Sequence, residues 1–168
     1  MPSRLLSTVQ VLTTTGYGMF GFYNDIDAER PEPPISAESW YSASPEMVEV
    51  RPACTLPSPA IRFELWDNEP SAYVIDGGDD PEVRALLEFH ASQGSIGLMA
   101  LAAGAEPGVF EVPAGWYWLD LLGYRRSIMP AREADLYERD ISPGDPEWER
   151  AEGTELYVAR LWPKPPGA

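Results

Sequence analysis

The chain has very little cysteine and histidine, because Cys54 and His90 are the only residues of these two types. A lone cysteine forms no internal disulfide, which is typical of proteins from a reducing compartment. Zinc sites built from cysteine and histidine need several such ligands, so this chain alone cannot assemble one. Cys54 and His90 lie in no known nucleophile signature, and P-loops, serine elbows and dinucleotide fingerprints are missing. The sequence therefore predicts a protein without catalytic residues and without a cofactor.

Long apolar runs are also missing. No stretch approaches the roughly 20 apolar residues that are needed to span a bilayer. The start of the chain, Met1 to Ser7, holds one positive charge and two leucines, which is too short for the apolar centre of a signal peptide. We therefore expect a cytoplasmic protein that does not bind a membrane.

Positive charge is scarce. The chain has 12 lysines and arginines against 27 aspartates and glutamates, so its formal net charge is −15. A surface of this sign repels phosphate groups, which argues against nucleic acid and anionic lipid as partners. The acids gather in residues 67–82 and 133–155. They form either a solvated surface that keeps the protein soluble and monomeric or a docking surface for a basic partner.

Segments long enough for an extended helix are missing too, because 18 prolines and 14 glycines are scattered along the chain. Apolar and polar residues alternate over short stretches instead, and Ile61, Phe63 and Leu65 share one face of such a stretch. This pattern predicts a single domain over residues 1–168. The expected fold is mainly β, an antiparallel β-sandwich of about seven or eight short strands with long loops.

Three pairs of neighbouring runs are expected to form hairpins, namely 8–12 with 17–23, 81–90 with 96–102, and 109–112 with 116–124. Residues 81–90 fit two alternatives, an alternating strand or a helix that begins behind Asp80. We favour the strand, because a turn at 92–94 and a second alternating run follow it.

Three further segments complete the expected fold. Residues 25–44 are rich in acid and proline and predict a long packed loop anchored by Trp40 and Tyr41. Residues 131–139 predict a short helical turn after a proline. Residues 155–162 predict the last strand.

Two tryptophans stand close together on the last predicted hairpin. Alternation places two groups of residues on opposite faces, with Tyr117, Leu119 and Leu121 toward the core and Trp116, Trp118 and Asp120 away from it. Neighbouring aromatic rings are costly to leave in water. They are covered by the 25–44 loop, by a partner protein, or by a carbohydrate that stacks on them.

The many carboxylates leave open two functions, calcium binding and hydrolysis by a pair of acids. Asp76, Asp79 and Asp80 near two glycines are calcium candidates, and Asp25 and Asp27 form a second pair. Neither stretch has the spacing of an EF-hand, and aspartate and glycine are common in turns without metal, so no metal is predicted. The abundance of acids also leaves open a hydrolase that works with two carboxylates.

One run of residues in the second half resembles a known family. The matching positions are Phe110, Pro113, Gly115, Tyr117 and Leu119, where a strand passes through a turn into an aromatic strand. With its surroundings, from about Glu82 onwards, this run resembles the ComJ family of small bacterial competence proteins. The resemblance implies a β-sandwich that binds and inhibits a partner nuclease, but it carries over no inhibitory residue.

These observations predict a non-catalytic acidic binding protein, an inhibitor or immunity-type partner of a basic enzyme such as a nuclease or a toxin. Nuclease active sites are positively charged, so an acidic protein is steered toward them. The expected partner-binding residues are two apolar anchors and two acidic groups, Trp116, Trp118, Asp76, Asp79, Asp80, Glu82, Glu147, Glu149 and Glu152. The alternatives are a ligand-binding sandwich for carbohydrate or calcium and, below it, the carboxylate-based hydrolase.

Overall fold

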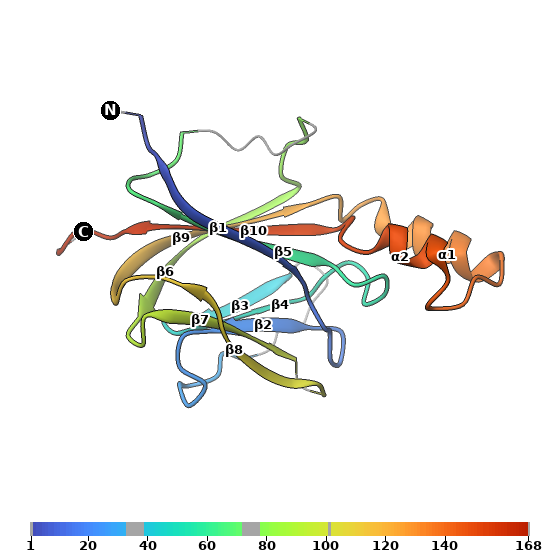
Figure 1. The fold of residues 1–168 in the computed structure, drawn as a ribbon, viewed down its shortest axis with the longest axis horizontal. Helices are drawn as coiled ribbons and strands as arrows, with labels where there is room; N and C mark the ends of the chain where they lie inside the picture. Colours follow the sequence, from blue (N-terminus) through green and yellow to red (C-terminus); the bar gives the residue numbers. More distant parts are fainter. Residues whose placement is uncertain (1, 33–38, 72–77, 101, 168) are drawn as a thin grey trace.

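The computed structural model describes residues 2–32, 39–71, 78–100 and 102–167, which form two five-stranded sheets and two helices (Figure 1). In spatial order, the first sheet consists of β1 (Leu5–Leu12), β5 (Ala60–Trp66), β10 (Leu156–Pro163), β9 (Gly115–Tyr124) and β6 (Val83–Ala91). The second consists of β3 (Tyr41–Ser44), β4 (Met47–Val50), β2 (Phe20–Tyr23), β7 (Ser95–Ala100) and β8 (Gly104–Glu111). The expected β-sandwich is confirmed, and the described residues form ten strands where seven or eight were expected.

The core lies between the two sheets and is largely aromatic. Phe63 of β5 stacks on Phe110 of β8 with ring centroids 5.7 Å apart, and Phe22 of β2 meets Phe63 edge to face at 5.3 Å. Leu119 and Leu121 of β9 are fully buried in the same cluster. The alternation along β5 and β9 therefore predicts the inward faces correctly.

One strand pair is parallel. β5 and β10 run in the same direction, with Ala60 opposite Leu156, while every other pair in the described residues is antiparallel. β10 thus lies between β5 and β9 and joins distant parts of the sequence. Alternation along single strands contains no information about this order.

All three predicted hairpins are wrong. β1 pairs with β5, whereas β2 pairs with β4 and β7. β6 pairs with β9, whereas β7 pairs with β2 and β8. β8 and β9 likewise lie in different sheets. Each of these three connections passes from one sheet to the other. A turn can join two strands that face each other across the core as well as two strands that pair in one sheet.

The ambiguous residues 81–90 form a strand, as favoured from the sequence. β6 pairs with β9 along its whole length, from Val83 opposite Gly123 to Ala91 opposite Gly115. The turn that follows it contains Gly94, whose φ is +75°. Glycine adopts this left-handed conformation at little cost.

The 25–44 segment is anchored as predicted. Trp40 is buried and stacks on Tyr157 of β10, with centroids 6.1 Å apart and an angle of 19° between the rings. Tyr41 begins β3, a strand that was expected to be loop. Residues 33–38 lie outside the described residues.

Two helices project beyond the sandwich between β9 and β10 (Figure 1). The first, α1 (Met129–Glu138), was expected as a short turn, and the second, α2 (Pro146–Ala151), was not expected. Leu136, Trp148 and Ala151 form a small buried cluster that holds the two helices together. We call residues 129–152 the acidic arm. No helix in the described residues is long and apolar enough to cross a membrane.

Candidate partner-binding surfaces

Trp116 and Trp118 lie on the outer face of the first sheet, as predicted. Trp116 is 45% exposed and stacks on the imidazole of His90, with centroids 4.5 Å apart and an angle of 12°. Trp118 is half-buried, and the ammonium of Lys164 lies 4.8 Å from the centre of its ring. This position is favourable for a cation–π contact.

The C-terminal residues cover part of the tryptophan pair. The backbone N–H of Lys164 donates to the carbonyl of Trp116 at 2.9 Å, and its ammonium pairs with Glu88 at 2.7 Å. A hollow of about 420 Å³ lies here, lined by Glu88, Trp116 and residues 164–167. In the part of the chain that the structure describes, the two rings are contacted from β6 and the C-terminal end. The described part of the 25–44 loop anchors in the core through Trp40, and residues 33–38 lie outside the described residues.

Two of the three described acids before β6, Asp79 and Glu82, are engaged within the molecule. Asp79 pairs with Arg125 at 2.7 Å. Glu82 accepts hydrogen bonds from the backbone N–H and the hydroxyl of Ser127, at 2.8 and 2.9 Å. Asp80 is exposed, and Asp76 lies outside the described residues. Asp79 and Glu82 therefore connect the start of β6 to the chain that leaves β9.

The structure describes Asp79 and Asp80 of the first calcium candidate, Asp25 and Asp27 of the second, and not Asp76. The described residues contain no group of three or more histidine, cysteine, aspartate or glutamate side chains that could hold a metal ion. The carboxylate of Asp25 accepts a hydrogen bond from the backbone N–H of Asp27 at 2.9 Å. This is the usual local role of aspartate in a turn.

The predicted acids of the second group lie on or beside α2. Asp145 begins this helix by accepting a hydrogen bond from the N–H of Glu147 at 2.8 Å, as an N-cap residue does. Glu147 pairs at 2.6 Å with Arg139, the C-cap residue of α1. Glu149 is exposed and Glu152 is half-buried.

The predicted residues that the structure describes lie on two separate surfaces. In the ladder between β6 and β9, His90 lies opposite Trp116 at one end and Val83 lies opposite Gly123 at the other. At about 3.4 Å per residue, these ends are roughly 24 Å apart. The tryptophans lie at the first end, while Glu82 and the acidic arm lie at the second (Figure 1). They do not make one compact docking patch.

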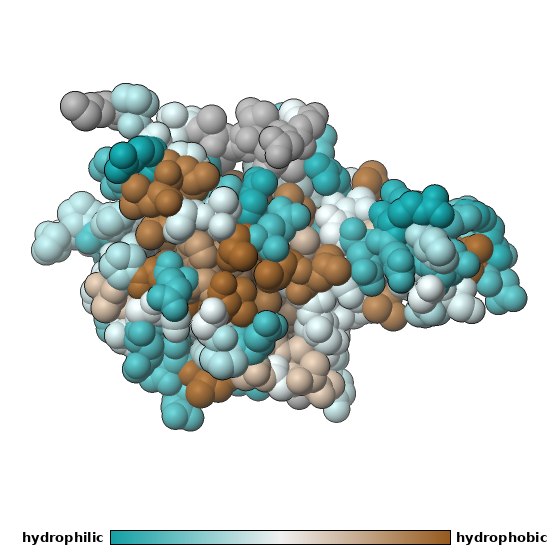
Figure 2. All heavy atoms as spheres, in the orientation of Figure 1, coloured by the Kyte–Doolittle hydropathy of each residue, from teal (hydrophilic) through white to brown (hydrophobic). Residues whose placement is uncertain are grey.

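The acidic arm holds an exposed aromatic residue that sequence reasoning missed. Tyr137 of α1 is 55% exposed and packs edge to face on the buried Trp148 of α2, with centroids 5.4 Å apart. The projecting part of the molecule, which holds α1 and α2, presents a mainly hydrophilic surface in this view (Figure 2). The Asp-Pro pair at residues 145–146 is a signal that could have revealed α2, since it supplies an N-cap followed by proline in the first turn.

Buried polar contacts hold the base of the acidic arm. The guanidinium of Arg126 lies 5.7 Å from the ring centres of both Trp40 and Tyr157 and donates to the Tyr157 hydroxyl and to the Arg51 carbonyl. The Tyr157 hydroxyl donates in turn to Glu155 at 2.6 Å. Burial raises the pKa of the Glu155 carboxyl, and the hydrogen bond from Tyr157 partly offsets this. The arm therefore stands on a well-packed base.

Comparisons with known proteins show the fold. No protein-family model matches the sequence, and no curated protein is significantly similar to it. The structure of ComJ from Bacillus subtilis, described as an inhibitor of the DNA degrading activity of NucA, matches with a TM-score of 0.58 and 12% identity, over 98% of this chain and 100% of that chain. A protein described as crocagin biosynthetic gene J matches with a TM-score of 0.55 and 14% identity, over the same shares of the two chains. The resemblance to ComJ is thus confirmed at the level of the fold and extends over nearly the whole chain.

Proposed function

We propose that this protein is a non-catalytic inhibitor or immunity-type partner that docks its acidic arm on a basic enzyme such as a nuclease. The observation on which this rests is the composition of the arm. Between Met129 and Glu152 there are eight carboxylate side chains and three arginines, together with the exposed ring of Tyr137.

The charges of the arm suit such a role. Arg139 is held by Asp135 and Glu147 at 3.1 and 2.6 Å, so its charge is already matched inside the arm. Glu138 and Glu149 are exposed and add negative potential at the surface. A field of this kind steers a basic partner toward the arm and raises the association rate. Tyr137, supported from below by Trp148, is the type of residue that forms an energetic anchor in an interface.

The fold supports the same proposal. ComJ, whose fold this chain shares, is described as a nuclease inhibitor. Fold likeness alone is a weak argument for function. Here it agrees with an independent observation, the acidic surface.

The residues best suited to nucleophilic chemistry are engaged in structure. Cys54 is buried, and burial together with the neighbouring Glu133 raises the pKa of its thiol to about 12. A thiol of this kind is a poor nucleophile, because the thiolate is the reactive form. The imidazole of His90 stacks on the ring of Trp116, and its Nδ1 lies 2.9 Å from the carboxylate of Glu46. These contacts support a role without catalysis.

The proposal is tested on basic fractions of the native host extract, in which DNA degradation is measured with and without the protein. We expect inhibition that weakens as salt is added, because salt screens exposed charges. In the variant Glu138→Gln with Glu149→Gln, the concentration for half inhibition should rise about threefold to tenfold.

The matched control is Glu106→Gln with Glu111→Gln, which removes the same charge from exposed positions on β8. This variant should inhibit like the wild type. Failure to inhibit any basic fraction, or equal loss in both variants, would refute docking through the acidic arm.

A second candidate function rests on the hollow beside Trp116. An exposed indole next to Glu88 and Lys164 resembles a small stacking site for a sugar ring. Titration with a panel of oligosaccharides, followed by tryptophan fluorescence, tests this candidate. A saturable change that disappears in Trp116→Ala would support it, and no change with any sugar would remove it.

A further inference from the structure

β1 forms one edge of the first sheet and differs from a typical edge strand. Among the described residues, it has a hydrogen-bonded neighbour only on the side of β5. Its sequence, from Leu5 to Leu12, contains no charged residue, no proline and no glycine. An edge strand presents unpaired N–H and C=O groups that can accept another strand.

The other three edges are protected in recognised ways. β6 bears Arg84 and Glu88 on its outer face. β8 contains Pro107 and ends in Glu111. β3 is only four residues long. Charge, proline and short length all discourage pairing between molecules, and β1 has none of them. Its one irregularity in the ladder with β5 is a register shift between Leu5 and Ser7, near the start of the strand.

β1 also exposes an apolar surface. Leu5, Leu6 and Leu12 are 40%, 48% and 50% exposed. Figure 2 shows hydrophobic residues in a band that follows the course of β1 in Figure 1. On a chain with a net charge of −15, this band is a neutral stripe.

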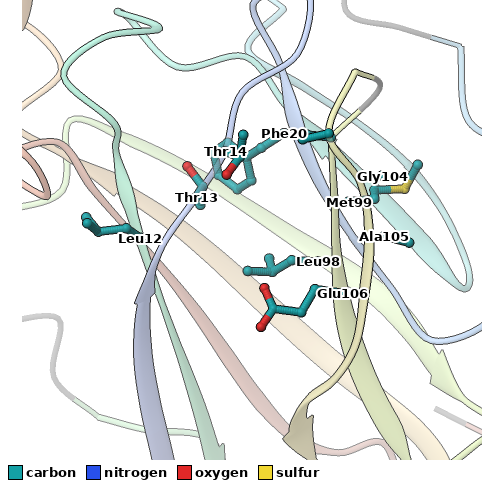
Figure 3. A pocket seen from close by; sticks show the side chains of 11 residues that line it. Leu12, Thr13, Thr14, Phe20, Leu98, Met99, Gly104, Ala105 and Glu106 are labelled. Carbon is teal, nitrogen blue, oxygen red and sulfur yellow. The ribbon is translucent and has the colours of Figure 1, made fainter. Parts of the chain in front are cut away.

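A hollow of about 120 Å³ lies beside the end of the apolar stripe, and its lining is mixed, with Thr13, Thr14 and Glu106 among apolar side chains (Figure 3). It lies where the end of β1 approaches the hairpin of β7 and β8, between Leu12 and Thr14 on one side and Leu98, Met99 and Ala105 on the other. A strand added beside β1 would direct some of its side chains toward this hollow.

We propose that β1 pairs antiparallel with β1 of a second copy of this chain, so that the two first sheets join across a two-fold axis. The charge distribution favours a second copy as the occupant. Two copies repel each other through their acidic surfaces, so they can meet closely only where both are neutral, and β1 is such a place. A two-fold axis brings the same patch of both copies together, which matches neutral with neutral and apolar with apolar.

The side chains define a register for this pairing. A two-fold axis at Val9 places Leu6 of each copy opposite Leu12 of the other, and Thr8 opposite Gln10. The two most exposed leucines of the strand then cover each other. Cross-strand pairs of this kind are the unit of stabilisation in a sheet.

Sedimentation of the whole protein over a wide range of concentrations tests the proposal. We expect a reversible dimer in the wild type. Leu6→Lys with Leu12→Lys places like charges opposite each other in the proposed register, and should weaken the dimer about tenfold or more. Under mild oxidation, Val9→Cys should form a disulfide-linked dimer, because the two copies of residue 9 face each other at the axis.

The matched control is Leu86→Lys with Ile128→Lys. These residues are 53% and 50% exposed, so the control replaces aliphatic side chains of similar exposure with the same two charges. It should dimerise like the wild type. Circular dichroism of both variants verifies that they are folded. A monomeric wild type at every concentration, or equal weakening in both variants, would overturn the proposal.

The same experiments can reveal a different partner for β1, namely a strand from another protein. If the wild type stays monomeric and an extended synthetic peptide with the β1 sequence binds it, β1 is a docking edge for a foreign strand and the dimer is rejected. Salt separates this inference from the proposed function. The dimer should strengthen with salt, because the repulsion between acidic copies is screened, whereas binding of a basic enzyme to the acidic arm should weaken.

Discussion

The carboxylate of Asp120 lies 2.5 Å from the guanidinium of Arg160 on the outer face of the first sheet, and their side chains are 0% and 4% exposed. Arg84 of β6 approaches the same carboxylate at 2.7 Å from the other side. The ion group therefore spans three neighbouring strands, β6, β9 and β10. Removing the Asp120 carboxylate would take away the negative charge that lies between the guanidinium groups of Arg84 and Arg160.

We expect Asp120→Asn to lower the free energy of unfolding by about 3 kcal/mol, because it removes the carboxylate from a buried ion pair. Denaturant titration measures this change. The control is Asp135→Asn, which removes an exposed partner of Arg139 and should leave the unfolding midpoint nearly unchanged, because exposed ion pairs stabilise a fold very little. Equal unfolding midpoints for the two variants would contradict the structural role of Asp120.

Asp120 illustrates what sequence patterning can and cannot reveal. Alternation along β9 correctly separates Leu119 and Leu121 from Asp120 and Trp118. It does not show that the outer face is itself largely covered, because that depends on segments distant in the sequence. Alternation therefore assigns Asp120 to the correct face of the sheet, but it does not predict that the side chain is buried there.

Strand existence was predictable, but strand pairing was not. The alternation in β5, β6 and β9 is local and depends on one face being buried. The order β5, β10, β9 depends on contacts between segments about a hundred residues apart, such as Ile61 with Tyr157. Short turns then misled the prediction, because the connections after β1, β6 and β8 cross between sheets.

For the candidate site too, the composition could be predicted from the sequence and the spatial arrangement could not. The acidic composition of the second half was evident from the sequence, and the structure gathers these residues on a projecting arm. The exposed Tyr137 and its support by Trp148 depend on how α1 and α2 pack. The separation of Trp116 from the acids depends on the register of β6 and β9, which no local pattern reveals.

Gly97 of β7 lies where a side chain does not fit. A Cβ atom there would come within 2.6 Å of the Tyr23 ring and 2.8 Å of the Glu106 carbonyl oxygen. We expect Gly97→Ala to lower the free energy of unfolding by about 2 to 3 kcal/mol, as overpacking does. Gly115→Ala is the control, because the nearest atom to its Cβ lies 4.0 Å away. Thermal unfolding of both variants checks this, and an unchanged midpoint for Gly97→Ala would contradict the observed packing.

The buried thiol of Cys54 predicts a loss of stability at alkaline pH. Burial raises its pKa from 9.0 to about 12, and Glu133 and Glu155 add to the effect. As pH rises from 9 toward 12, the thiol ionises in the unfolded chain first, so this group's contribution to stability is complete below pH 9 and is lost above it. Cys54→Ala should therefore lose less stability than the wild type between pH 8 and pH 11, which is the interval that contains most of this change.

Denaturant titrations of the two proteins at several alkaline pH values measure this difference. Both proteins share the buried tyrosines, so the comparison isolates Cys54. Parallel pH profiles would mean that the thiol ionises equally well in the folded state.

The two most exposed aromatic anchors, Tyr137 and Trp116, provide a direct comparison between the two surfaces. They are 55% and 45% exposed, so replacing either with alanine should change the stability of the fold little. If the acidic arm is the docking surface, Tyr137→Ala should raise the inhibitory concentration by about fivefold or more, since an interface aromatic of this kind typically contributes more than 1 kcal/mol.

Trp116→Ala should inhibit like the wild type, because it lies at the far end of the β6–β9 ladder from the arm. The measurement is inhibition of DNA degradation by the same basic fraction, with thermal unfolding to verify that each variant is folded. The opposite ranking, with Trp116→Ala defective and Tyr137→Ala active, would move the docking surface to the tryptophan end of the sandwich. In that case, the negative charge of the acidic arm would act only through long-range attraction, and inhibition should then weaken with salt in both variants to the same degree.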